Sequence, residues 1–272
     1  MRIPFAPLAP LAAQGVVIAL AGFVLFFAPT LGHDLWGWEL TPFNTRFLGA
    51  IYLAALVPFA TIIAVRRWEL AQLVVPMDFV FMSIVLCVSL AYADRFMSDR
   101  PVTWAWFTIF VSIPLYTAYF LWRYRESLRP VVHRPPQRLR TALLAAAVPL
   151  GGYGLAMLAA PEAVTAFWPW PIDGFHGRVY SAIFVSLALG AAISARGGGP
   201  IELRTLGLTC VALGALEPIG LVVVDANVNK VDWSAAGTWA WLVMFVALFA
   251  YGLALSSATL QRKHPAVHAA PA

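Results

Sequence analysis

The chain has 272 residues, of which 61% are hydrophobic and 11% are charged, with a net charge of +5 and a mean hydropathy of +0.78. A soluble domain carries about 25% charged residues, so this composition excludes an ordinary soluble protein. The positive charge does not indicate nucleic-acid binding, because the arginines stand at the ends of apolar runs rather than on one face of a soluble module.

Eight apolar runs follow one another, each long enough to cross a bilayer as a helix. They cover residues 11–30, 47–65, 70–93, 101–122, 141–160, 179–195, 203–224 and 235–257. The first run resembles a signal peptide, but no A-x-A cleavage site follows it. We therefore expect it to be a retained helix.

The sequence contains an internal duplication. Residues 28–51 match residues 160–183 without a gap, at an offset of 132 positions, and the segment Thr-Trp-Ala-Trp at 103–106 recurs at 238–241. Two ordered matches along half a chain indicate repeated structural units. An even number of spans separates equivalent helices, so both units point the same way through the membrane, about a pseudo-twofold axis along the membrane normal.

These patterns predict an all-α integral membrane protein with eight transmembrane helices, arranged as two tandem, same-orientation four-helix repeats. The expected parts are a first repeat (1–122), a basic linker (123–140), a second repeat (141–260) and a disordered tail (261–272). Thirteen Lys and Arg residues fall on the side of the termini and five on the other side. The positive-inside rule therefore places both termini in the cytoplasm, in a plasma (inner) membrane of the bacterial type.

Two acids, Asp78 and Glu217, lie within predicted spans, and each is close to a proline, Pro76 or Pro218. Ionisable groups inside a membrane usually face a protein interior and often handle ions or substrates. The structural alternative is a protonated acid that bonds a backbone carbonyl freed by the proline.

Arg46 and Arg178 occupy equivalent positions in the two repeats, where each begins a helix. A cation at a helix N-terminus opposes the helix dipole, so another group must stabilise it. One hypothesis is a bound anion or lipid headgroup in each half. The other is a headgroup anchor or a surface ion pair with Asp34, Glu39 or Asp173.

Tryptophans gather on the side away from the termini. Nine are expected there, against two on the other side, and an interfacial aromatic belt would populate both. The excess suggests an outer aromatic surface that docks a membrane-protein partner or holds an apolar ligand. Its candidate residues are Trp36, Trp38, Trp104, Trp106, Trp168, Trp170, Trp239 and Trp241.

The sequence predicts no cofactor and no metal site. No histidine or lysine lies within a predicted span, which argues against a bundle haem or a retinal Schiff base. His33 and His176 are too few and too far apart in sequence to indicate a metal site. Cys87 and Cys210 are expected at opposite depths and are not expected to form a disulfide.

The favoured functional hypothesis is binding or transport of a small molecule, ion or lipid at the interface of the two repeats, in a cavity lined by Asp78 and Glu217. A first alternative is a non-catalytic accessory or assembly subunit that docks through its outer tryptophans. A second is an interfacial enzyme acting on lipid-like substrates near His33, Asp34 or Asp173. The lipid bilayer is the one partner common to all three, and an enzyme is the least favoured.

Overall fold

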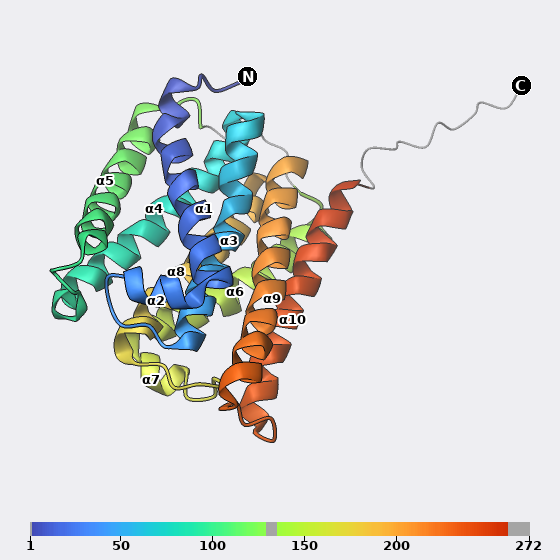
Figure 1. Ribbon diagram of the computed structural model, residues 1–272. Coiled ribbons are helices and arrows are strands. Elements are labelled where there is room, and N and C mark those ends of the chain that lie inside the picture. The colour runs from blue at the N-terminus through green and yellow to red at the C-terminus, as the bar shows by residue number, and fades with distance from the viewer. Residues whose placement is uncertain (1, 129–134, 261–272) are drawn as a thin grey trace, which may run out of the picture.

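The computed structural model describes residues 2–128 and 135–260, and every regular element in these ranges is a helix (Figure 1). In chain order the elements are η1 (Ala6–Leu8), α1 (Ala9–Phe27), α2 (Pro29–Leu35), α3 (Pro42–Val65), α4 (Trp68–Ala91), η2 (Ala93–Arg95), α5 (Pro101–Arg123), α6 (Gln137–Ala159), α7 (Pro161–Val164), α8 (Gly174–Gly197), α9 (Pro200–Val228) and α10 (Ala236–Leu260). Eight helices in the described ranges are long and apolar enough to cross a membrane, which confirms the predicted number of spans.

Among the helices that begin earlier than hydropathy predicts, α3 and α8 show the largest difference, five residues each. Thr41 accepts a hydrogen bond from the Asn44 backbone N–H at 3.2 Å, and this cap starts α3 at Pro42. Asp173 accepts one from the His176 N–H at 2.8 Å and starts α8 at Gly174. Capping satisfies the free N–H groups of the first turn even where that turn is polar, so the true start lies outside the apolar run.

The predicted first span is divided in the structure. Helix α1 ends at Phe27, and the short α2 starts at Pro29 after a break at Ala28. Proline has no N–H to continue a helix and clashes with helical backbone before it, which explains the break. The end of the predicted first span and the residues that follow it therefore form a further short helix.

The long helices pack in four pairs, and two further helix contacts join these pairs. Helix α1 packs on α3, α4 on α5, α6 on α8, and α9 on α10. Helix α3 then contacts α9, and α4 contacts α8, which joins the two halves of the chain. The chain start and the end of α10 lie at one end of the bundle, and α2 and α7 lie towards the other (Figure 1).

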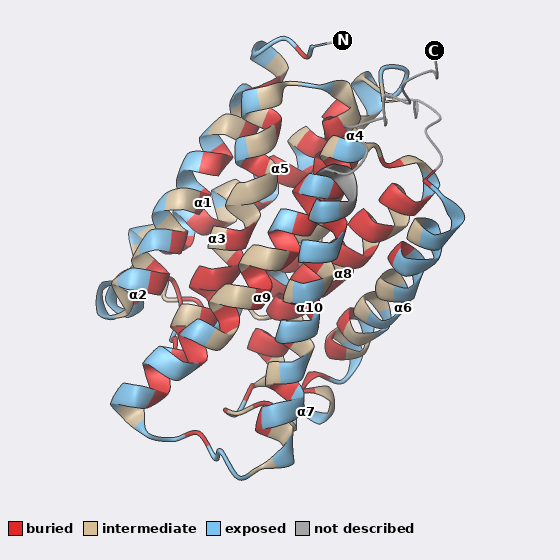
Figure 2. Ribbon diagram, turned by 90° about the vertical axis from the view of Figure 1, so that its right-hand side faces the viewer, coloured by how far each residue is buried: buried red, intermediate tan, exposed pale blue. Residues whose placement is uncertain are grey.

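Burial in this bundle does not follow hydrophobicity. Helix α8 is the most deeply buried of the eight, whereas α6 is the least buried (Figure 2). Large side chains such as Leu20, Leu115 and Val148 are more than half exposed. Lipid solvates such groups as well as a protein core does, so an apolar sequence does not show which helix face is buried.

Glycines mark the places where helices approach most closely. A Cβ added to Gly49 of α3 would lie 2.7 Å from the backbone nitrogen of Phe26 on α1. On α10, a Cβ at Gly252 would lie 2.4 Å from the carbonyl oxygen of Gly207 on α9. Small residues at membrane helix interfaces let backbones meet in this way.

Part of the predicted linker and all of the predicted tail fall outside the described residues. Of the predicted linker, residues 123–128 and 135–140 are described. Because α5 ends at Arg123 and α6 begins at Gln137, only 124–128 and 135–136 among them lie outside a helix. The expected disorder of residues 261–272 concerns only residues that the structure does not describe.

Candidate functional site

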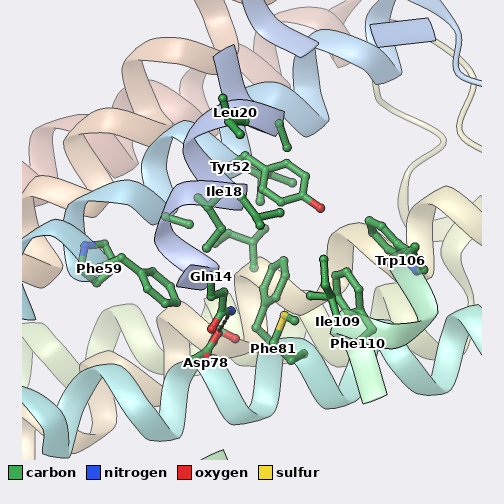
Figure 3. Close-up of a pocket in the computed structure, with 18 of the residues that line it drawn as sticks. Gln14, Ile18, Leu20, Tyr52, Phe59, Asp78, Phe81, Trp106, Ile109 and Phe110 are labelled. Atoms are coloured by element: carbon green, nitrogen blue, oxygen red, sulfur yellow. Dashed lines mark hydrogen bonds between the residues drawn. The ribbon is translucent and has the colours of Figure 1, made fainter. Parts of the chain in front are cut away.

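A cavity of about 350 Å³ lies between α1, α3, α4 and α5, with residues of α8 and α9 completing its wall (Figure 3). This volume is within the range of small-molecule binding sites. Its lining is almost wholly aliphatic and aromatic. Among the described lining residues, Asp78 is the only one that carries a formal charge.

A buried polar pair stands in this apolar wall. The Gln14 side-chain Nε2 donates a hydrogen bond to Asp78 Oδ1 at 2.8 Å, as the dashed line in Figure 3 shows. Gln14 is 5% exposed and Asp78 is 7% exposed. Two oxygens, Gln14 Oε1 and Asp78 Oδ2, are buried without a hydrogen-bond partner in the structure. An unpaired buried polar atom lowers the stability of the fold by about 1–3 kcal/mol. A purely structural role for the pair therefore does not explain its presence.

Asp78 was among the candidate residues predicted from the sequence, and Gln14 was not. Gln14 is the only polar side chain of α1, in the segment Ala-Pro-Leu-Ala-Ala-Gln-Gly-Val-Val-Ile-Ala-Leu. A single amide in an otherwise apolar span was the signal that could have found it. The contact itself joins residues 64 positions apart and cannot be read from the sequence.

Two of the three hydroxyl groups in the described lining, those of Ser186 and Thr209, already use their protons. Ser186 of α8 donates to the Met77 carbonyl at 3.1 Å, and Thr209 of α9 donates to the Thr205 carbonyl at 2.9 Å. Both residues line the cavity. A hydroxyl has one proton to give, so neither group supplies a donor to the unpaired oxygens of Gln14 and Asp78.

One wall of the cavity faces the surface that lipid covers. Val17 and Leu20 of α1 line the cavity and are 41% and 63% exposed, and Leu35 of α2 is 55% exposed. At the chain-start end, the Tyr116 hydroxyl of α5 donates to the Pro7 carbonyl. This bond holds α5 near the start of α1.

Glycine content explains why the cavity lies next to α4 and α5. Helices α9 and α10 pack backbone to backbone through Gly207, Gly214 and Gly252. Helices α4 and α5 contain no glycine, and Thr117 of α5 stands where α10 has Gly252, 135 positions later. Larger side chains keep α5 further from α4, which leaves room for the cavity.

Glu217 is not brought together with Asp78. It is 2% exposed, and its Oε1 has no hydrogen-bond partner in the structure, but it is not among the lining residues of this cavity. It lies on α9, beside Pro218. Any function of Glu217 therefore stays a prediction, separate from the site at Asp78.

The two arginines have partners within the protein. Arg46 donates to the Phe26 carbonyl at 2.5 Å, in the last turn of α1, where free carbonyls carry partial negative charge. Arg178 donates to the Tyr92 hydroxyl at 2.8 Å and to the Gly174 carbonyl at 3.0 Å. These contacts stabilise the two cations, which the dipoles of their own helices oppose. An anion site at either arginine stays a prediction.

The tryptophans divide into a buried cluster and exposed residues. Trp36, Trp38, Trp106, Trp168, Trp170 and Trp241 are each at most 8% exposed. Trp104 and Trp239 are 63% and 55% exposed. Six of the eight candidate residues for an outer surface are therefore interior. Docking through the remaining two stays a prediction.

Reciprocal bonds connect this cluster across the two halves. Trp38 Nε1 donates to His176 Nε2 at 3.2 Å, and Trp170 Nε1 donates to Asn44 Oδ1 at 3.0 Å. Each donor and each acceptor lies 132 positions from its counterpart. Because His176 Nε2 accepts the hydrogen bond from Trp38, the other ring nitrogen, Nδ1, carries the proton and donates a hydrogen bond to Asp173 Oδ1, at 2.9 Å.

Compared with protein-family models, curated proteins and solved structures, the chain matches none. Function is therefore inferred from the geometry of the chain itself. Among the described residues, no group of three or more His, Cys, Asp or Glu side chains is placed to hold a metal ion.

The polar residues at the far end from the termini have structural partners. The His33 ring Nδ1 lies 2.8 Å from the Leu40 carbonyl oxygen. Partial burial tends to raise the pKa of Asp173, but the hydrogen bonds from His176 and the charge of Arg95 lower it to about 2. Asp173 therefore stays ionised and caps α8.

Proposed function

We propose that this membrane protein binds a small, predominantly apolar molecule in the cavity between α1, α3, α4 and α5. The observation that carries the proposal is a cavity of small-molecule size whose apolar wall holds the Gln14–Asp78 pair, with two unpaired oxygens. Apolar pockets with few convergent polar groups are the usual form of such sites. The lipid-facing wall at Leu20 favours entry from the bilayer.

We further propose that the chain is two tandem repeats, 1–122 and 141–260, in the same orientation. The pairing of α1 with α3 and of α4 with α5 matches that of α6 with α8 and of α9 with α10. The contacts α3–α9 and α4–α8 are also equivalent under exchange of the halves. Both observations, with the reciprocal tryptophan bonds, support a pseudo-twofold axis.

Within this arrangement the Gln14–Asp78 pair belongs to the first repeat alone, although α8 and α9 also line the cavity. At the offset of 132 positions, Gln14 corresponds to Ala146 and Tyr52 to Phe184. Asp78 corresponds to Cys210, which is buried. The second repeat therefore has no counterpart of the Gln14–Asp78 pair, and it packs against the first repeat through the α3–α9 and α4–α8 contacts.

A pair of equivalent substitutions tests the proposed cavity. Ala105 and Ala240 each stand between two tryptophans in the repeated segment, and both are exposed, but only Ala105 lines the cavity. Ala105→Phe should fill part of the cavity and Ala240→Phe should leave it unchanged. The measurement is photolabelling of the protein in lipid nanodiscs with a neutral aryl diazirine, followed by peptide mapping.

In the wild type we expect label on Phe81 and Met82 of α4, which line the cavity. Met82 is only 4% exposed, so lipid alone does not reach it. Ala105→Phe should remove most of that label and Ala240→Phe should not. Equal labelling of Met82 in both variants would show that the cavity does not take up apolar molecules.

A further inference from the structure

Resting on that proposed binding site, we propose that its ligand is an organic amine, bound in its protonated form, with an apolar or aromatic body. The ammonium group would donate to Gln14 Oε1 and to Asp78 Oδ2, the two unpaired oxygens of the site. Hydrogen-bonding capacity, charge and the aromatic lining of the site all favour this class of ligand.

When Asp78 is ionised, the Gln14–Asp78 pair presents two acceptor oxygens without a donor, and the one buried unpaired donor among the described lining residues is the Trp36 indole Nε1–H. Gln14 uses its Nε2 to donate to Asp78 Oδ1, which leaves its carbonyl oxygen as an acceptor alone. The hydroxyl protons of Ser186 and Thr209 are bonded to backbone carbonyls. A primary ammonium has three N–H donors on one atom, enough to satisfy both oxygens at once.

Charge complementarity favours a cation over a neutral alcohol. Asp78 is the only formally charged residue among the described lining residues, and no lysine, arginine or histidine is among them. Tyr52 is the other titratable group of the lining, and Gln14, Ser186 and Thr209 on the surrounding helices are neutral. An isolated carboxylate in such surroundings is costly, so Asp78 suits the cavity as a neutral acid until a cation enters.

Binding then exchanges one proton. The amine leaves its extra proton in bulk water and enters the bilayer as the neutral base. In the cavity, the O–H bond of Asp78 breaks and an N–H bond forms, which gives a carboxylate paired with an ammonium. The net result is one proton released to water for each amine bound.

The aromatic lining suits the body of such a ligand. Figure 3 shows Tyr52, Phe59, Phe81 and Trp106 around the same space as the Gln14–Asp78 pair. Phe81 is three residues after Asp78 on α4 and so shares its helix face. Aromatic ring faces attract organic cations, and the attraction strengthens when the cation is desolvated.

Access to the oxygens requires a local movement. With the side chains as they lie in Figure 3, Gln14 Oε1 and Asp78 Oδ2 are covered. Binding must therefore turn one of these side chains towards the cavity. A rotation of this kind leaves the helices in place and is within the normal rotamer freedom of Gln and Asp.

The experiment compares two probes with the same carbon skeleton, 1-naphthylmethylamine and 1-naphthylmethanol. Each is equilibrated at neutral pH with the full-length protein in lipid nanodiscs, with protein-free nanodiscs as background. Proton release on binding is followed with an indicator dye in weak buffer. The variant Asp78→Asn is compared with Glu217→Gln, which removes a buried acid that does not line the cavity.

We expect the amine to bind the wild type about tenfold or more tightly than the alcohol, because its hydrogen bonds are made by a charged group. Close to one proton should be released per amine and none per alcohol. Asp78→Asn should lose that preference for the amine, and Glu217→Gln should keep it. The wild-type comparison and the proton count need no variant, so they stand even if Asp78→Asn fails to fold.

Two outcomes overturn the inference. In the first, the alcohol binds as tightly as the amine, and Ala105→Phe blocks its binding. The cavity would then be a binding site for neutral ligands, and the proposed function would survive. The other is amine binding without proton release and unchanged in Asp78→Asn. If neither probe binds and Ala105→Phe leaves the labelling of Met82 unchanged, the proposed function falls as well.

Discussion

At the scale of single residues, the acids of this protein differ in how completely they are paired. Asp225, near the end of α9, accepts hydrogen bonds from the Lys230 and Val231 backbone N–H groups and from Trp233 Nε1. Its contacts close the loop after the helix. Asp78 has one bonded oxygen and one unpaired oxygen next to a cavity. Full pairing indicates a structural role for Asp225, and incomplete pairing sets Asp78 apart.

A substitution at Asp173 can remove the negative charge of the helix cap while it keeps the capping hydrogen bond. Asn at this position still accepts a hydrogen bond from the His176 N–H, because Asn caps helices as well as Asp does. Asp173→Asn therefore removes the charge that faces Arg95, at 3.8 Å, and His176. We expect a lower melting temperature in mild detergent at pH 7, with a modest change because Asp173 is 42% exposed.

The difference between Asp173→Asn and the wild type should depend on pH in one direction. The folded pKa of about 2 is below the unfolded value near 4, so the ionised group stabilises the fold above about pH 4. This contribution is lost as the pH falls from about 4 towards 2. Melting curves recorded between pH 7 and pH 3 should converge, and curves that diverge on acidification would contradict the assignment.

At the scale of elements, the two halves use the same helix pairs with different spacing. Gly22 lies against Leu53 in the α1–α3 pair, and Gly154 lies against Val185 in the α6–α8 pair, each 132 positions from its counterpart. The α9–α10 pair adds glycines that the α4–α5 pair lacks. Glycine thus brings helices together in three pairs, and its absence from the fourth leaves the cavity.

Gly252→Ala tests the tight α9–α10 contact. The new methyl group would lie 2.4 Å from the Gly207 carbonyl oxygen, a backbone atom that cannot turn away, so the helices must separate. Overpacking of this kind costs about 1–3 kcal/mol, and we expect the melting temperature to fall. Gly152→Ala on α6 is the control, because an added Cβ there meets nothing within 4 Å. Equal stability of the two variants would mean that α9 and α10 do not pack this closely.

At the scale of the whole molecule, the even number of long helices puts residue 2 and the end of α10 at the same end of the bundle. The loops that carry Ser98 and Ser234 are equivalent in the proposed repeats and should lie together on the opposite side. Ser127, just after α5, should lie on the side of the termini. All three serines are exposed.

Cysteine labelling tests this topology in intact cells, after both native cysteines, Cys87 and Cys210, are replaced by alanine. A membrane-impermeant maleimide should label Ser98→Cys and Ser234→Cys from outside. It should reach Ser127→Cys only after the membrane is permeabilised. Labelling of Ser98→Cys and Ser234→Cys from opposite sides would show that the two halves point in opposite directions.

The sequence by itself determined the number of long helices and their approximate positions, because membrane spans depend on a local property, the length of an apolar run. It also located Asp78 and Glu217 within those runs. It missed the starts of α3 and α8, since capping by Thr41 and Asp173 is invisible to hydropathy.

Only the tertiary structure decided which of these groups share a site. The Gln14–Asp78 contact, the exclusion of Glu217 from the cavity and the burial of six tryptophans depend on which helix faces meet and how closely. In a chain that is apolar on every face, hydrophobicity does not select those faces, because lipid and protein interior solvate them almost equally. Glycine, proline and a few polar side chains make the selection instead, through contacts between residues far apart in the chain.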